Sequence, residues 1–424
     1  MIVEYEEMLA GLDEVDWAGL NHAYGSAEDV PGRIRAVCGD DEPAREDAFL
    51  GLFNHLAHQG TRCQASPFAV PFLARIALAG PAPARERVLE LLTRLAVSWD
   101  DELEILDGAD VAVWRAEAAD HTPEKLLPWY DEQLAVEHDA ERRRNLAGMR
   151  EWMAAGNPVD ARDAQMRSYD AVLAELPGLL GLLDDVDPRI RTRAAYLLAW
   201  FPEAADTTLP LLLALAAREP APVATATALV AAGIVGTPAL SEEFASYLGA
   251  EDSLVRWAAA VAIAHLAGRT GATPGAARLD GAVAELARAA STPAPVPATD
   301  FGQGDFHGYT AKTLLALPAP VPSSVVVACL PRIEPHNRTY VARTVLPEVF
   351  PVPLPEPLPP YADLSGPQQQ LLRTVADLEE GHWNTAGIGV RLAPHGLPDT
   401  HNALRAYVGL PPLPARCGCD HART

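Results

Sequence analysis

Apolar positions between residues 169 and 268 recur with the spacing of amphipathic helices. The first helix of this stretch carries one apolar face, made of Leu179, Leu180, Leu182 and Leu183. A polar turn from Asp184 to Pro188 interrupts that helix, and a second apolar pattern starts at Arg189. The same order of helix, turn and helix returns twice before Gly268. The pattern therefore predicts three consecutive helical hairpins of one kind.

The spacing of these hairpins indicates a repeat protein. Aligning their turns places Asp187, Pro220 and Asp252 in register, at intervals of 33 and 32 residues. Intervals of this size between similar helical pairs are typical of an α-solenoid. Alanine and leucine dominate the chain, and the alternation expected of β-strands is nearly absent. We therefore expect an all-α fold, an α-solenoid with irregular terminal caps.

The turns of the repeat carry helix-capping residues. Asp187 precedes Pro188, a residue well suited to the first helical position, and Asp252 stands at the matching place. Arg191 and Arg256 follow these aspartates at the same spacing, Asp-x-x-x-Arg, which resembles HEAT-repeat proteins. The middle hairpin departs from this spacing. We expect the two arginines to tie adjacent turns together.

Two further helical pairs are predicted near the N-terminus. Pro43 and Pro83 open similar helices at an offset of 40 residues, within the range of HEAT-like units. Between them, the sequence His58-Gln59-Gly60 resembles a turn of actinobacterial HEAT-repeat-domain proteins, whose function is unsettled. The resemblance implies the repeat fold and leaves the activity open.

This turn permits three interpretations. Gly60 suits the left-handed cap at a helix C-terminus, where His58 meets the last carbonyl groups. His55 and His58 could instead share a metal, although only the distant Cys63 offers a further ligand. The third interpretation is a polar binding pocket made of His55, His58, Gln59 and Arg62. Because no third ligand has a diagnostic spacing, we predict neither a metal nor a cofactor.

Residues 1–35 are expected to cap the repeat. Trp17, Leu20 and Tyr24 fall at helical spacing, which predicts a capping helix with these side chains packed inward. His22 lies off this stripe, so a surface position is expected for it.

A glycine-aromatic segment, Asp300 to Tyr309, is the most conspicuous irregular stretch. It lacks the Lys-Ser/Thr pair and the preceding strand of a phosphate-binding loop. Asp300, Asp305 and His307 are its chemically useful groups. The segment is either a binding loop that projects from a rigid array or a simple connection between repeats.

Seven segments follow from these patterns. They are 1–97 (cap and first helical pairs), 98–165 (an irregular, tryptophan-rich helical segment), 166–290 (regular repeats), 291–350 (a loop and helical pairs), 351–363 (a proline-rich linker), 364–410 (a C-terminal helical cap) and 411–424 (a flexible tail). Within them, residues 132–144 alternate in charge like an exposed helix, and His382-Trp383-Asn384 is expected in a link. The tail contains Cys417, Cys419 and His421, for which we expect disorder and incidental metal affinity.

Charge and composition restrict the possible partners. The formal net charge of −24 disfavours general binding to nucleic acid or to anionic membranes. No signal peptide and no membrane-spanning stretch is visible, and five irregularly placed cysteines fit a reducing cytoplasm. The sequence gives no indication of the oligomeric state.

Three classes of function remain open. No nucleophile elbow, kinase set, Walker motif or zinc-protease helix is present. The favoured class is a non-catalytic binding module, whose acidic concave face engages a basic protein or peptide as a scaffold or as an immunity-like neutraliser. The alternative is a helical-repeat enzyme of small-molecule metabolism, with a polar pocket near His58 or His307. A HEAT-like DNA glycosylase fits less well, because the charge is acidic and no basic stripe is visible.

Overall fold

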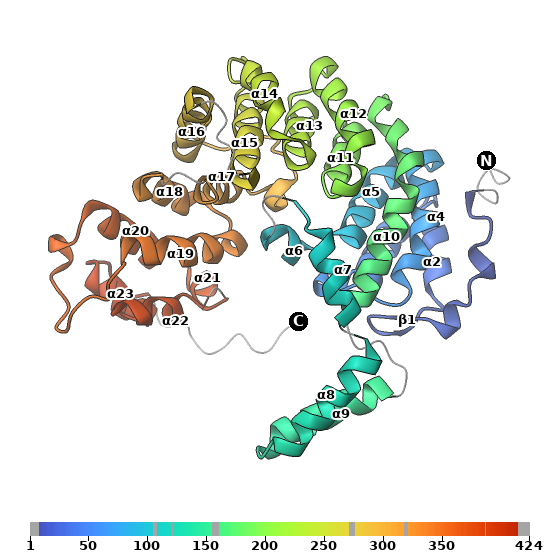
Figure 1. Cartoon of the computed structure of the whole chain (residues 1–424), viewed down its shortest axis with the longest axis horizontal. Helices are drawn as coiled ribbons and strands as arrows, with labels where there is room; N and C mark the ends of the chain where they lie inside the picture. Colours follow the sequence, from blue (N-terminus) through green and yellow to red (C-terminus); the bar gives the residue numbers. More distant parts are fainter. Residues whose placement is uncertain are drawn as a thin grey trace. The chain divides into compact units, whose positions relative to one another are not determined.

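The computed structural model describes residues 8–104, 108–120, 122–154, 161–270, 276–317, 321–385 and 387–413. Their regular secondary structure is almost entirely helical, which confirms the all-α class (Figure 1). The chain forms two compact units, Met1–Thr237 and Pro238–Thr424. The boundary falls inside the predicted repeat region 166–290. None of the described helices is both long and apolar enough to cross a membrane.

Where a capping helix is predicted from Trp17 to Tyr24, the first unit has a short helical turn followed by a β-hairpin. Its elements up to residue 96 are η1 (Leu12–Glu14), η2 (Trp17–Gly19), β1 (Asn21–His22), β2 (Gly25–Ser26), α2 (Val30–Ala36), α3 (Glu42–Leu56), η3 (His58–Gly60), α4 (Ser66–Ala79) and α5 (Ala82–Ala96). Trp17 is buried, but Tyr24 is 61% exposed, so the predicted inward stripe is wrong. The helical turn ends because Leu20 has extended backbone angles, after which β1 pairs antiparallel with β2.

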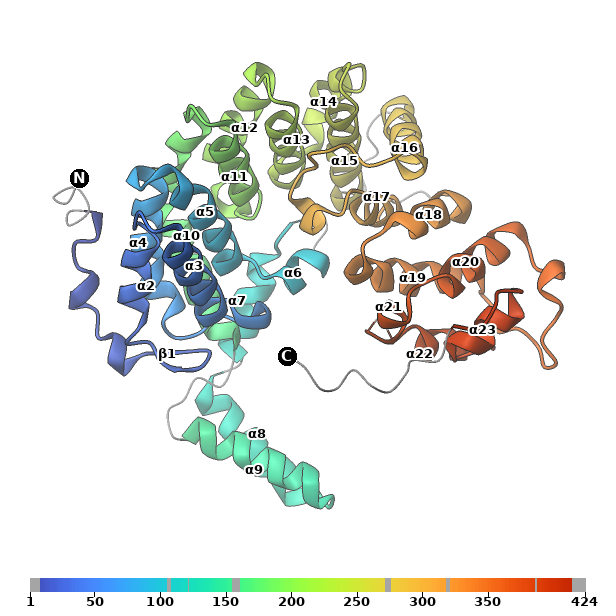
Figure 2. The same cartoon turned by 180° about the vertical axis from the view of Figure 1, so that it is seen from behind.

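The two proline-initiated helices are α3 and α5. Pro43 and Pro83 lie in their first turns, where a missing backbone N–H breaks no hydrogen bond. Helix α4 packs against α5 and α10, and its apolar side chains are largely buried (Figure 2). These contacts place the core of the unit between the helices.

The rest of the unit contains α6 (Trp99–Glu104), α7 (Val111–Asp120), α8 (Pro123–Val136), α9 (Ala140–Ala154), α10 (Ala161–Leu179), η4 (Leu180–Asp184), α11 (Pro188–Leu198), η5 (Pro202–Ala204), α12 (Ala205–Arg218) and α13 (Pro222–Val235). Helix α8 packs against α9. The exposed helix expected over residues 132–144 is broken at residues 137–139. The break occurs because Asp139 accepts a hydrogen bond from the backbone N–H of Arg142 and starts a new helix.

Helical pairs of the expected kind are present on both sides of the unit boundary. In the first unit, α11 follows η4, and α12 packs against α13. Asp187 Oδ1 accepts a hydrogen bond from the backbone N–H of Arg189 at 2.9 Å, and in the second unit Asp252 Oδ1 accepts one from Leu254 at 2.8 Å. Both predicted helix caps are therefore confirmed.

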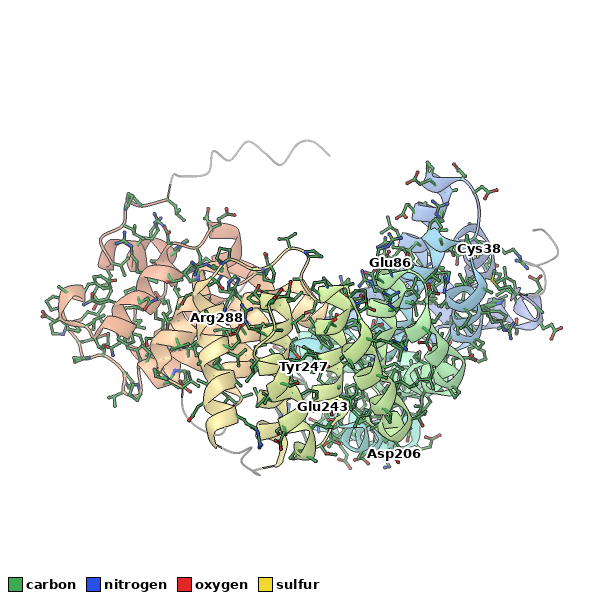
Figure 3. All side chains as sticks on the ribbon, turned by 90° about the horizontal axis from the view of Figure 1, so that it is seen from above. Cys38, Glu86, Asp206, Glu243, Tyr247 and Arg288 are labelled. Atoms are coloured by element: carbon green, nitrogen blue, oxygen red, sulfur yellow. The ribbon has the colours of Figure 1, made fainter. Side chains whose placement is uncertain are left out.

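Arginine–carboxylate pairs connect neighbouring turns. Arg191 makes two hydrogen bonds to Glu219, at 2.5 and 2.8 Å, across 28 residues. In the second unit, Arg256 Nε lies 3.5 Å from Glu285. Glu86 of α5, labelled in Figure 3, lies within ion-pair distance of arginines on α11. The expected tie between turns is thus present at both predicted arginines, and it is tighter at Arg191.

The second unit contains η6 (Pro238–Leu240), α14 (Ser241–Tyr247), α15 (Ser253–Thr270), α16 (Ala276–Ser291), η7 (Phe301–Gly304), α17 (Phe306–Leu315), α18 (Ser323–Cys329), η8 (Leu330–Arg332), α19 (Pro335–Val349), η9 (Tyr361–Asp363), α20 (Gly366–Ala376), α21 (Glu380–Thr385), α22 (Ile388–Leu392), η10 (Ala393–His395) and α23 (His401–Tyr407). Residues 351–360 are non-helical, as their six prolines require. Residues 382–384 belong to α21 rather than to a link. The tail with Cys417, Cys419 and His421 lies outside the described residues.

Candidate functional site

Two histidines and one aspartate meet at the N-terminal hairpin. His22 is in β1, Asp29 precedes α2, and His55 lies in the last turn of α3. His22 Nε2 lies 3.1 Å from Asp29 Oδ1, and His55 Nδ1 lies 3.2 Å from Asp29 Oδ2. The side chains of His22 and His55 are only 6% and 16% exposed, whereas that of Asp29 is 38% exposed. One carboxylate therefore joins three separate elements of the fold.

The hairpin fixes the proton on His22. The backbone N–H of Tyr24 donates to His22 Nδ1 at 2.9 Å, so a neutral His22 carries its hydrogen on Nε2. That hydrogen points at Asp29 Oδ1. The backbone N–H of Ala23 also donates to the carbonyl of His55 at 3.0 Å. The turn between β1 and β2 is thus tied to α3 through both backbone and side chains.

The charge of Asp29 is stabilised by its surroundings. Arg33 Nε donates to Asp29 Oδ2 at 2.8 Å. Burial alone would raise the pKa of Asp29, but Arg33 and the two imidazoles hold that pKa below its usual value. Burial and the neighbouring His22 lower the pKa of His55. At neutral pH the site therefore contains an ionised Asp29 and an uncharged His55.

The three side chains do not fit a metal ion, although their ligand atoms all lie within 4.8 Å of one another. The rings of His22 and His55 are stacked, with centroids 4.1 Å apart and planes inclined by 22°. A metal must lie in the plane of each imidazole at about 2.0–2.1 Å from its nitrogen, and nearly parallel planes do not converge on such a point. Binding at His22 Nε2 would also require a proton on Nδ1, which already accepts the N–H of Tyr24.

The solvent side of this cluster presents what we name the Tyr24 surface, formed by Tyr24, His58 and Gln59. The hydroxyl of Tyr24 lies 3.1 Å from His58 Nδ1, and the two rings meet edge to face at 5.0 Å. Gln59 is exposed and has a positive φ of 47°, which is unfavourable for a residue with a side chain. Thr61 holds this conformation through hydrogen bonds from its N–H and its hydroxyl to the carbonyl of His58.

The four residues predicted to form a pocket have different neighbours in the structure. His55 contacts Asp29 and the ring of Tyr24, His58 contacts the same tyrosine, and Gln59 is exposed. Arg62 is buried and bonds to Asp101 at 3.3 Å and to the carbonyl of Gly60 at 2.8 Å. Gly60 has the expected positive φ, 81°, but it is the last residue of η3 and does not directly follow α3, which ends at Leu56.

Cys63 does not join the two histidines as a third ligand. Its Sγ lies 3.4 Å from the backbone carbonyl of His55 and 3.1 Å from the hydroxyl of Ser66. Burial raises the pKa of the Cys63 thiol, which keeps it protonated and a poor metal ligand.

The glycine-aromatic segment does not project from the fold. Asp305 and His307 are 3% and 4% exposed, and Asp300 starts the short helix η7. Asp305 accepts hydrogen bonds from backbone N–H groups at the start of α17 and α19, and His307 Nε2 lies 2.8 Å from the carbonyl of Thr292. Positive φ angles at Gly302 and Gln303 turn the chain inward. These side chains hold the segment in the core, so of its two interpretations the projecting binding loop does not describe it.

His22, Tyr24 and Asp29 are the site residues that sequence reasoning missed. The surface position expected for His22 is wrong, because its side chain is only 6% exposed. Two-residue strands carry no alternation from which a hairpin could be predicted. The available signal was Tyr24-Gly25, because Gly25 adopts a φ of 130° at the turn.

Comparison with known proteins adds little to this site. No protein-family model matches the chain, and no curated protein is similar to it. A crystal structure of an engineered protein from the Northeast Structural Genomics Consortium aligns over 90% of this chain and 87% of its own, at 16% identity and a TM-score of 0.27. This value is too low to support an argument about fold or function.

Proposed function

We propose that the chain is a non-catalytic α-solenoid binding module for a basic protein or peptide, and that the Tyr24 surface is one of its contact points. The observation that carries the proposal is the exposed Tyr24 side chain, held in place by His58 and by the buried cluster beneath it. Tyrosine is frequent at the energetic centres of interfaces, because it buries a large area with few rotatable bonds.

The support beneath Tyr24 lowers the entropic cost of binding. Its backbone N–H donates to His22, and His22 contacts the carboxylate of Asp29, the residue that precedes α2. An aromatic side chain that is already ordered loses less conformational freedom when a partner covers it. The strained backbone of Gln59 lies beside it, and strain of this kind is common at functional sites.

The charge of the chain selects the class of partner. Asp and Glu outnumber Lys and Arg by 57 to 33. Several arginines of the first unit are already paired with carboxylates of the protein, including Arg33, Arg94 and Arg191. An acidic surface of this kind accelerates encounter with a basic partner, and a lysine or arginine can lie over the ring of Tyr24.

Native mass spectrometry of the protein, purified gently from its own host, tests this proposal. We expect a co-purifying basic polypeptide that is lost from Tyr24→Ala and retained by Phe68→Ala, a change at another exposed aromatic residue on α4. Equal retention by both variants would remove the Tyr24 surface from the interface. A bound small molecule in place of a polypeptide would favour the enzyme alternative instead.

A further inference from the structure

The second unit contains a cavity of about 340 Å³ that the proposed function does not use. Its polar lining comes from α19, from the end of α20 and from the turn that follows, and η8 packs against both helices. The lining side chains that matter are Arg338, Arg373, Asp377, Leu378 and Glu379. Cavities of this volume lie at the lower end of the range for small-molecule sites.

Arg338 is incompletely satisfied in this cavity. One terminal nitrogen donates to the carbonyl of Ile333, but its Nε is buried and has no hydrogen-bond partner among the residues that the structure describes. A buried donor without a partner costs about 1–3 kcal/mol, and more when it is charged. Burial also lowers the pKa of Arg338, although Glu379 and two other acids act in the opposite direction. A ligand oxygen would supply the hydrogen-bond acceptor that the Nε–H group of this guanidinium lacks.

Arg373 presents a second guanidinium to the same space. Its Nη1 donates to the carbonyl of Val408 at 3.1 Å. Within the described part of the chain, neither Arg338 nor Arg373 forms an ion pair with a carboxylate. Arg94, by contrast, forms an ion pair with Glu102, in which Nη1 lies 2.6 Å from the carboxylate. Two arginines that share a cavity without ion pairs favour an anionic group.

Two carboxylates line the same cavity. Asp377 and Glu379 are exposed, and Asp377 Oδ1 has only a loose contact of 3.8 Å with Arg405. The cavity therefore carries two positive and two negative side chains. A phosphate dianion would be repelled by the carboxylates, and a simple amine by the arginines. A small molecule that carries one negative and one positive group can pair with the two arginines and with the two carboxylates at once.

We propose that this cavity binds a free α-amino acid. Its carboxylate accepts hydrogen bonds from Arg338 Nε and Arg373, its ammonium group faces Asp377 and Glu379, and an apolar side chain lies beside Leu378. The site requires no catalytic group and no contact with the Tyr24 surface, so it stands independently of the proposed function.

Isothermal titration calorimetry of the full-length protein tests the proposal. The probes are L-leucine, L-methionine, L-phenylalanine and L-glutamine, each titrated separately. For the tightest of them, the carboxylate lacking the amino group, the amine lacking the carboxylate, and inorganic phosphate serve as single-charge controls. We expect each control to bind at least tenfold more weakly than the amino acid. Absence of saturable heat from all four amino acids would overturn the proposal, as would phosphate binding of equal strength.

Substitutions locate the binding to this cavity. Arg373→Met removes an exposed guanidinium without opening the core, and Asp377→Asn removes one carboxylate; each should weaken the amino acid at least tenfold. Arg391→Met, at an exposed arginine of α22 outside the cavity, is the matched control and should bind normally. Arg338→Gln is the most direct variant, provided that its circular dichroism spectrum matches that of the parent. Unchanged affinity in both Arg373→Met and Asp377→Asn would show that the ligand binds elsewhere.

Discussion

At the scale of single residues, Gln59 shows how the site is maintained against local preference. Its φ of 47° lies in the left-handed region, where a side chain crowds the backbone. Neither glutamine nor the preceding His58 favours this backbone conformation. Two neighbours hold it in place: Gly60, which has a φ of 81°, and Thr61, whose hydroxyl donates to the carbonyl of His58.

We expect Gln59→Gly to stabilise the protein. Glycine adopts a positive φ without steric cost, so the free energy of unfolding should rise by roughly 0.5–1 kcal/mol after the entropic penalty of glycine is included. Urea denaturation measures this change. If the Tyr24 surface binds a partner through Gln59, affinity should fall in the same variant. A loss of both stability and affinity would show that the side chain supports the fold.

His55 should make the first unit sensitive to acid. Its folded-state pKa is below the ordinary value of 6.5, so the unfolded chain takes up a proton there more readily than the folded chain. Stability from this group is present above pH 6.5 and is lost as the pH falls from 6.5 towards the folded pKa. The groups that face His55 are His22, Tyr24, Asp29 and Arg33.

The measurement is urea denaturation at several pH values for the parent and for His55→Gln. We expect a smaller acid-induced loss of stability in the variant. His401 in the second unit also has a lowered pKa and contributes equally to both proteins, so the difference isolates His55. Parallel pH curves for the two proteins would contradict the assignment.

At the scale of elements, the arginine contacts between turns differ in strength. Arg191 holds Glu219 through two hydrogen bonds, and the Glu219 side chain is 1% exposed. Arg256 is 3.5 Å from Glu285, and its other bonds are to the carbonyls of its own turn. Removing Arg191 therefore leaves a buried carboxylate without its cation, whereas Glu285 retains Arg288, labelled in Figure 3.

Arg191→Ala should lower the melting temperature more than Arg256→Ala does. We expect Arg191→Ala to lower the free energy of unfolding by about 2 kcal/mol, because a hydrogen-bonded charge loses its partner. Differential scanning calorimetry of both variants, beside Arg142→Ala at an exposed position of α9, provides the comparison. Equal melting temperatures for Arg191→Ala and Arg142→Ala would refute the role of this contact.

The sequence predicted these elements well where a local signal existed. Asp187 and Asp252 preceded apolar helical patterns, and Pro43 and Pro83 marked helix starts, because capping and proline geometry act within a few residues. The site was not predictable in this way. Asp29 and His55 lie 26 residues apart, and nothing in either segment indicates the other. Tertiary contacts decided both the burial of His22 and the inward turn of the glycine-aromatic segment.

At the scale of the whole molecule, charge should control the rate of association. The net charge of −24 attracts cationic partners electrostatically. Salt screens this attraction, which extends over a Debye length of about 8 Å at physiological ionic strength. The effect bears on encounter with a partner more than on the contacts formed afterwards.

We expect the association rate constant for a lysine- and arginine-rich peptide to fall steeply with added sodium chloride, with little change in the dissociation rate constant. Stopped-flow fluorescence over a range of salt concentrations measures both constants. A neutral peptide of the same length is the control. An association rate that is flat from low to high salt would contradict the role of the acidic surface.

The buried thiols have a practical consequence for labelling. Burial raises the pKa of Cys38 to about 11 and that of Cys329 to about 12, and the pKa of Cys63 is also raised. Maleimides and iodoacetamides react with thiolates, so these three cysteines do not react with them at neutral pH. With Cys417 and Cys419 changed to serine, one cysteine introduced at Val296, which is 95% exposed, would carry a fluorophore at a single defined position.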